Sequence, residues 1–105
     1  MKLNLGVLGG GSWGTTVASL IAKNNETILW ARNEKVVQEI NEEHTNSKYL
    51  PGAKLNMNLK ASTSIEETVK NADVIVMGIP SQNFREVLRT AKPHIRPWVP
   101  IVSLS

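Results

Sequence analysis

The chain has 105 residues, of which 41% are hydrophobic and 20% are charged. This composition is that of an ordinary globular domain, and it excludes a collagen-like or intrinsically disordered chain. The net charge is +3, from 12 basic and 9 acidic residues that are dispersed along the chain, and aromatic residues are few. We therefore expect no nucleic-acid-binding surface, whereas a small positive excess suits an anionic small molecule.

The sequence contains no cysteine, which excludes disulfide frameworks, thiolate metal sites and cysteine nucleophiles. No apolar run approaches the roughly 20 residues that a bilayer-spanning helix needs, and the N-terminus lacks the pattern of a signal peptide. The two histidines, His44 and His94, have no second metal ligand at a recognisable spacing. We expect a cytoplasmic protein with neither a membrane span nor a metal site.

The first half of the chain predicts two buried strands, each followed by a helix. Residues 3–8 are largely apolar and end at a glycine-dense turn, residues 9–14. A second strand is expected over residues 27–31, and the helices over residues 15–23 and 34–43. The first helix has an expected inward stripe of Val17, Ala18, Leu20, Ile21 and Ala22.

The second half of the chain predicts three further strands and two further helices. The strands are expected over residues 59–62, 74–79 and 101–104, and the middle one is a near-continuous apolar run typical of central parallel strands. Helices are expected over residues 64–71 and 82–91. The expected N-caps of the helices over 34–43 and 64–71 are Asn33 and Ser64.

Strands that alternate with helices along the whole chain predict an α/β fold with a parallel sheet and helices on both faces. Right-handed crossovers make a doubly wound sheet of about five strands the natural topology. The chain stops inside or just after its fifth predicted strand. We therefore expect residues 1–105 to be one domain from the front of a longer protein.

The turn at residues 9–14 fits the pattern G-x-G-x-x-G between a predicted strand and a predicted helix. Gly9 permits the tight turn, Gly11 lets the backbone approach a pyrophosphate, and Gly14 lets the helix pack closely on the strand. Backbone N–H groups at the helix start would bind the phosphates. The pattern predicts a nicotinamide-dinucleotide site on a Rossmann-type fold, and a glycine-rich turn without a ligand is the alternative.

The residue that follows the second predicted strand is informative about the cofactor. An NAD site has an Asp or Glu there, about 20 residues past the loop, for the ribose 2′-hydroxyl. This chain has Arg32 instead, and the nearest carboxylate is Glu34. A guanidinium suits a 2′-phosphate or an adenine face, which favours NADPH or tolerance of both cofactors. A solvated arginine without a ligand is the alternative.

Several separated motifs resemble those of bacterial-type NAD(P)-dependent glycerol-3-phosphate dehydrogenases, and together they extend over nearly the whole chain. The matching segments are residues 9–16, 29–32, 46–52, 72–75 and 79–81. The resemblance implies a full-length enzyme that interconverts dihydroxyacetone phosphate and sn-glycerol 3-phosphate by hydride transfer with NAD(P)H and supplies glycerophospholipid synthesis. A homodimer is a further expectation.

The same resemblance assigns cofactor contacts. It implies contacts from Ser12 and Trp13 in the glycine loop, from Arg32, and from Tyr49 in the polar stretch after the second helix. It also places Pro80 and Ser81 near the nicotinamide. Plausible structural alternatives are a Trp13 that plugs the start of the helix and a Tyr49 that anchors its loop.

The chain departs from the family pattern at its C-terminus. The family continues from a strand like residues 102–105 into a Lys-Gly pair and then a helical domain with the catalytic lysine, and neither is present here. We therefore expect no catalytic residue in this chain, weak cofactor binding and no activity on its own. Other dehydrogenases of the hydroxyacid or ketopantoate type, and a stand-alone dinucleotide-binding module, are the alternatives.

Overall fold

The structure is a computed structural model that describes residues 2–79 and 81–104. Its centre is a parallel sheet of five strands in the order β3-β2-β1-β4-β5. The strands are β1 (Asn4–Leu8), β2 (Glu26–Trp30), β3 (Lys60–Ser62), β4 (Val74–Met77) and β5 (Ile101–Ser103). The order and the parallel pairing confirm the predicted doubly wound α/β fold.

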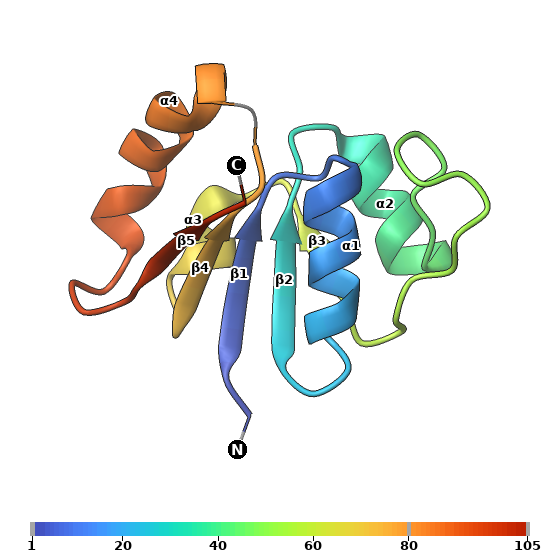
Figure 1. The fold of residues 1–105 in the computed structure, drawn as a ribbon, viewed down its shortest axis with the longest axis horizontal. Helices are drawn as coiled ribbons and strands as arrows, with labels where there is room; N and C mark the ends of the chain where they lie inside the picture. Colours follow the sequence, from blue (N-terminus) through green and yellow to red (C-terminus); the bar gives the residue numbers. More distant parts are fainter. Residues whose placement is uncertain (1, 80, 105) are drawn as a thin grey trace.

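Helices connect the strands and cover both faces of the sheet. They are α1 (Ser12–Ile21), α2 (Glu34–Glu43), α3 (Ile65–Val69) and α4 (Ser81–Ala91), and a short 3-10 helix, η1 (Lys92–His94), follows α4. Figure 1 shows α1 and α2 beside each other near β2 and β3, with α4 at the opposite end of the sheet.

Two hydrophobic cores fill the layers between the sheet and its helices. Because side chains alternate along a strand, Val7 of β1 faces the core under α1 and α2, while its neighbour Leu8 faces the core under α3 and α4. In the same way Leu29 and Trp30 of β2 belong to opposite cores. Burial on both faces explains why the central strands are almost continuously apolar.

The first helix begins earlier than the sequence pattern predicts. We expected a turn over residues 9–14 and a helix from residue 15, but α1 starts at Ser12, so the turn is limited to residues 9–11. The prediction for Leu20 was also wrong, because its side chain is 59% exposed. The helix contacts the sheet through Gly14, Ala18 and Ala22, which are four residues apart and share one face.

Both predicted N-caps are confirmed. The side chain of Asn33 accepts a hydrogen bond from the backbone N–H of Lys35, and that of Ser64 accepts one from Glu67. These contacts satisfy helix-start donors that have no partner inside the helix. The Asn33 cap sets the start of α2 directly after β2, at the edge of the sheet where the glycine loop lies.

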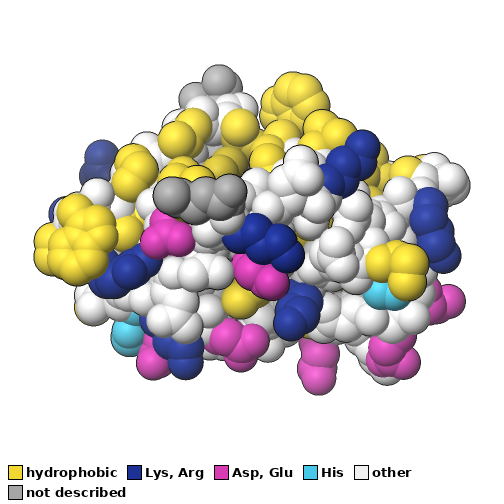
Figure 2. Space-filling model, turned by 90° about the horizontal axis from the view of Figure 1, so that it is seen from below, with side chains coloured by type: hydrophobic (Ala, Val, Ile, Leu, Met, Phe, Trp, Pro, Cys, Tyr) yellow, Lys and Arg dark blue, Asp and Glu magenta, His cyan; other side chains and the backbone are white. Residues whose placement is uncertain are grey.

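The lower end of the molecule, in the orientation of Figure 1, carries charges of both signs. Figure 2 shows basic and acidic side chains interspersed on it, with hydrophobic side chains gathered along one margin. Across the described residues 2–79 and 81–104, no helix combines the length and the apolar character that crossing a membrane requires.

Candidate functional site

A cleft lies at the carboxyl ends of the strands, where the topology changes direction. The chain leaves β1 for α1 on one face of the sheet and leaves the adjacent β4 for α4 on the other face, which opens a crevice between the two connections. The cleft has a volume of about 610 Å³. Its described lining residues are Gly9, Gly10, Gly11, Trp30, Ala31, Arg32, Asn33, Val36, Lys48, Tyr49, Gly78, Ile79, Asn83 and Val87.

Gly9 directly follows β1 and begins the turn that leads to α1. Its φ of 129° lies in a region that residues with a Cβ rarely adopt. Its N–H donates to the carbonyl oxygen of Trp30 at 2.9 Å, which ties the turn to the end of β2. The predicted role of Gly9 in the tight turn therefore agrees with its geometry.

Gly14 packs backbone against backbone in the first turn of α1. A Cβ added to Gly14 would overlap the carbonyl oxygen of Gly9. A Cβ on Gly78, after β4, would in turn lie 3.0 Å from the Cα of Gly14. Glycines from three separate elements thus let α1 approach the sheet, and the sequence pattern identified two of them.

The first turn of α1 presents backbone donors without partners. Gly11 is the N-cap, and no side chain caps this helix. The amides of Ser12, Trp13 and Gly14 have no hydrogen-bond partner within the described part of the chain. A Cβ added to Gly11 would meet no atom within 4 Å, so the space beside this turn is open. Such a helix start attracts anions, because free N–H groups and the helix dipole act together.

The charged side chains that line the cleft are positive. Arg32 follows β2 and lies with its guanidinium carbon 5.8 Å from the centre of the Trp30 ring. The Lys48 ammonium lies 5.4 Å from the centre of the Tyr49 ring. No Asp or Glu is among the described lining residues. Two cations therefore line the cleft together with Gly9, Gly10 and Gly11, which suits a phosphorylated ligand.

Asn46 joins the glycine loop to the segment that carries Lys48 and Tyr49. Its fully buried side chain donates to the Gly10 carbonyl oxygen at 3.1 Å and to the Thr15 hydroxyl at 3.0 Å. From the sequence, Asn46 is only the first residue of the family motif over residues 46–52, with no role of its own. A local signal for this role is absent from the sequence, because the contact joins residues 36 positions apart.

The remaining predicted site residues have different surroundings. The Ser12 hydroxyl donates to the backbone carbonyl of Tyr49 at 2.8 Å, so its backbone N–H is the group without a partner. Trp13 is 64% exposed and is not among the residues that line the cleft. Ser81 is the first residue of α4, and Pro80 lies outside the described residues.

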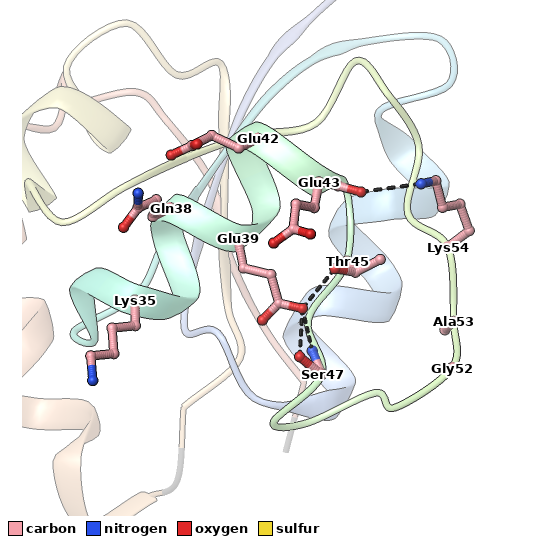
Figure 3. A pocket seen from close by; sticks show the side chains of 10 residues that line it. All are labelled: Lys35, Gln38, Glu39, Glu42, Glu43, Thr45, Ser47, Gly52, Ala53 and Lys54. Atoms are coloured by element: carbon pink, nitrogen blue, oxygen red, sulfur yellow. Dashed lines mark hydrogen bonds between the residues drawn. The ribbon is translucent and has the colours of Figure 1, made fainter.

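A second cleft, of about 600 Å³, lies on the outer side of α2 (Figure 3). Its lining includes the acidic side chains of Glu39, Glu42 and Glu43, and it contains none of the glycine-loop residues. Acidic groups disfavour a phosphate ligand, so the first cleft, which no described Asp or Glu lines, suits a phosphate better than this one. The described residues 2–79 and 81–104 contain no group of three or more His, Asp or Glu side chains that could hold a metal ion.

The topology, the glycine turn and the cleft at the switch point define a dinucleotide-binding domain of the Rossmann class. Residues 4–105 match the family model described as the N-terminus of NAD-dependent glycerol-3-phosphate dehydrogenase. The chain belongs to this family.

Individual relatives agree with the family assignment. The chain is 52% identical over 105 residues to "Glycerol-3-phosphate dehydrogenase [NAD(P)+] 2" of Sphingopyxis alaskensis, and the match covers 100% of the chain and 32% of the relative. It therefore spans about a third of that relative's length. This relative is named for NAD(P)+, and the matching family is described as NAD-dependent.

Solved structures agree with the fold. A glycerol-3-phosphate dehydrogenase structure from Saccharomyces cerevisiae matches with a TM-score of 0.89 and 31% identity, over 98% of this chain and 33% of that chain. One from Coxiella burnetii matches with a TM-score of 0.87 and 32% identity, over 97% and 32%. A ketopantoate reductase from Ralstonia eutropha, at 20% identity and a TM-score of 0.77, shows the shared fold alone.

Proposed function

We propose that this chain is the cofactor-binding domain of a glycerol-3-phosphate dehydrogenase, with the pyrophosphate of NAD(P)(H) at the first turn of α1. One observation carries the proposal: the N–H groups of Ser12, Trp13 and Gly14 are free beside the open space at Gly11. Three donors and the positive end of the helix dipole match the charge and the oxygen acceptors of a pyrophosphate.

In this proposal, residues around the loop have separate roles in binding the cofactor. Gly9 and Gly14 hold the loop in place, and Tyr49 lines the wall of the cleft near the pyrophosphate. We assign Arg32 to the 2′-phosphate of NADP and therefore propose a preference for NADPH. Trp13, Pro80 and Ser81 remain part of the proposal through the family resemblance.

The reaction itself belongs to the longer protein in this proposal. When bound, the reduced cofactor would donate a hydride to dihydroxyacetone phosphate, and the oxidised cofactor would accept one from sn-glycerol 3-phosphate, the product used in glycerophospholipid synthesis. The present chain binds and orients the dinucleotide at the carboxyl edge of the sheet. In this proposal, the lysine that supplies the proton belongs to a part of the longer protein outside this chain. The longer protein is also proposed to be a cytoplasmic homodimer.

Calorimetric titration with NADPH and with NADH tests the cofactor assignment. A charge-assisted hydrogen bond contributes about 1.5–3 kcal/mol, so we expect Arg32→Ala to weaken NADPH binding by about 10- to 100-fold. NADH binding should change much less, because NADH has no 2′-phosphate. Arg89→Ala, which removes the same charge from the exposed end of α4, is the control. Equal losses for both cofactors would remove the 2′-phosphate role from Arg32.

A chimera tests the reaction. In it, this chain replaces the matching N-terminal third of the Sphingopyxis relative, and the oxidation of NADPH is followed with dihydroxyacetone phosphate as substrate. We expect turnover that is lost when Gly11 is changed to Val, because the larger side chain fills the space beside the free amides. A folded chimera that binds NADPH without reducing dihydroxyacetone phosphate would contradict the proposed substrate. Light scattering of the same protein tests the dimer.

A further inference from the structure

Glu39 accepts three hydrogen bonds from the loop that follows α2. Its Oε2 atom accepts from the Thr45 hydroxyl at 2.6 Å, the Ser47 hydroxyl at 2.6 Å and the Ser47 backbone N–H at 2.9 Å. Figure 3 shows the carboxylate on α2 with dashed lines to both residues. The neighbouring carboxylates Glu42 and Glu43 line the same cleft, and no hydrogen bond or ion pair to their side chains occurs within the described residues.

The two residues that Glu39 binds, Thr45 and Ser47, flank Asn46. The Asn46 side chain donates to the glycine loop and not to α2. Asn46 is fully buried and donates to the Gly10 carbonyl oxygen, between Gly9 and the N-cap of α1. Its own backbone carbonyl accepts from the Leu50 N–H at 2.7 Å, which closes a tight turn around Lys48 and Tyr49. The loop is therefore attached to α2 on one side and to the glycine loop on the other.

The part of this loop that lies between the two attachments forms a wall of the dinucleotide cleft. Lys48 and Tyr49 line that cleft, and the Tyr49 carbonyl accepts from the Ser12 hydroxyl at 2.8 Å. A shift of residues 45–47 would move Asn46 away from Gly10 and would move both lining side chains. The contacts of Glu39 thus hold the loop that carries this wall of the cleft.

We propose that Glu39 is a positioning residue for dinucleotide binding and does not itself contact the dinucleotide. It holds residues 45–47, and this keeps Asn46, Lys48 and Tyr49 in place beside the glycine loop. This inference rests on the proposed binding of NAD(P)(H) in the cleft. It adds a residue that neither the glycine pattern nor the family resemblance assigned.

The electrostatics of Glu39 are consistent with this role. The hydrogen bonds from Ser47 and Thr45 lower the pKa of Glu39 below its ordinary value, and partial burial opposes the shift. The carboxylate is therefore ionised at neutral pH, and its bonds to the loop are of the stronger, charge-assisted kind. A neutral glutamine at this position would keep an acceptor oxygen and lose the charge.

Calorimetric titration with NADPH, at a temperature where every variant is folded, tests the proposal. We expect Glu39→Ala to raise the Kd for NADPH about tenfold, in line with the contribution of a charge-assisted hydrogen bond. Glu39→Gln should lie between Glu39→Ala and wild type. Glu42→Ala, which removes the same charge one turn along α2, should leave the Kd unchanged. Thermal unfolding of each variant is measured in parallel.

The possible outcomes separate this inference from the proposed function. If Glu39→Ala lowers the melting temperature and keeps the wild-type Kd, Glu39 is purely structural and the inference fails, while the proposed function stands. If the wild-type protein binds no NADPH, the proposed function fails and the inference falls with it. Should Glu39→Ala not fold, Ser47→Ala is the second variant. It removes one of the three hydrogen bonds to Glu39, that of the Ser47 hydroxyl, and leaves those of the Thr45 hydroxyl and the Ser47 backbone N–H. An unchanged Kd in that variant overturns the inference.

Discussion

Replacing Gly11 with alanine separates binding from folding at the glycine loop. The backbone at Gly11 has φ −74° and ψ −176°, a conformation that any residue adopts. A Cβ there meets no protein atom within 4 Å, so the substitution creates no clash in the free protein. In the proposed complex the same Cβ occupies the space through which the pyrophosphate approaches the amides of α1.

The magnitudes of the competing effects favour a small change in stability. Alanine is a poorer N-cap than glycine, by about 0.5–1 kcal/mol. Alanine also reduces the conformational entropy of the unfolded chain, which stabilises the protein by about 0.4–1 kcal/mol. The two effects oppose each other, so we expect a net change below about 1 kcal/mol, or at most about 4–8 °C in melting temperature. Binding should weaken by about 10- to 100-fold if one charge-assisted hydrogen bond to phosphate is lost.

Gly14→Ala is the matched comparison, since its effect should be the reverse. The added Cβ overlaps the carbonyl oxygen of Gly9, which belongs to the backbone and cannot rotate away. Overpacking of this kind costs about 1–3 kcal/mol. The gain in helix propensity from glycine to alanine, about 1 kcal/mol, offsets only part of it.

Urea unfolding gives the stability of each variant, and calorimetry with NADPH gives its affinity. We expect Gly11→Ala to fold with nearly wild-type stability and to bind weakly, and Gly14→Ala to be clearly less stable. A Gly11→Ala variant with the wild-type Kd would refute the reasoning, because the pyrophosphate would then not approach this turn. Strong destabilisation by Gly11→Ala would show that the space beside the loop is occupied by protein.

Two further predictions concern groups beyond the loop. Asn46→Ala should lower the free energy of unfolding by about 1–3 kcal/mol, because it removes buried hydrogen bonds to Gly10 and Thr15, and a loss below about 0.5 kcal/mol in urea unfolding would contradict this. The backbone N–H of Asn4, and then the Arg96 guanidinium, hold the pKa of Asp73 below its ordinary value of 3.8. Because the folded-state pKa is the lower one, Asp73 stabilises the protein at neutral pH, and this contribution declines as the pH falls below 3.8 through the folded-state pKa. The stability difference between wild type and Asp73→Asn should therefore shrink over that acid range, and a difference that stays constant down to pH 2 would be evidence against it.

The order and type of the elements were predictable from local patterns. The expected strand over residues 74–79 and the observed β4 (Val74–Met77) begin at the same residue, although β4 ends two residues earlier. A central parallel strand is apolar on both faces and is easily recognised. The caps at Asn33 and Ser64 were predictable for a similar reason, since a cap depends on residues within three positions of it. The start of α1 was not, because glycines inside a helix conceal its beginning.

The candidate site was predictable only where it is local in the sequence. Gly9, Gly11 and Gly14 follow a fixed spacing, and Arg32 lies two residues after the end of β2, so each has a signal within its own segment. The position of Trp13 in the loop motif carries no signal for its side chain, which is 64% exposed and is not among the described residues that line the cleft.

The sequence by itself determined that strands and helices alternate, that a glycine turn follows the first strand and that a cation follows the second, since each depends on spacing along one short segment. Only the tertiary structure decided that Gly78 packs against Gly14, that Asn46 holds Gly10, and that Glu39 holds the loop around Asn46. The first two contacts join segments far apart in the sequence, and they form because a parallel sheet brings the carboxyl ends of its strands, and the connections that follow them, to one edge. The Glu39 contacts instead join α2 to the loop that follows it, and they depend on how that loop folds back along the helix.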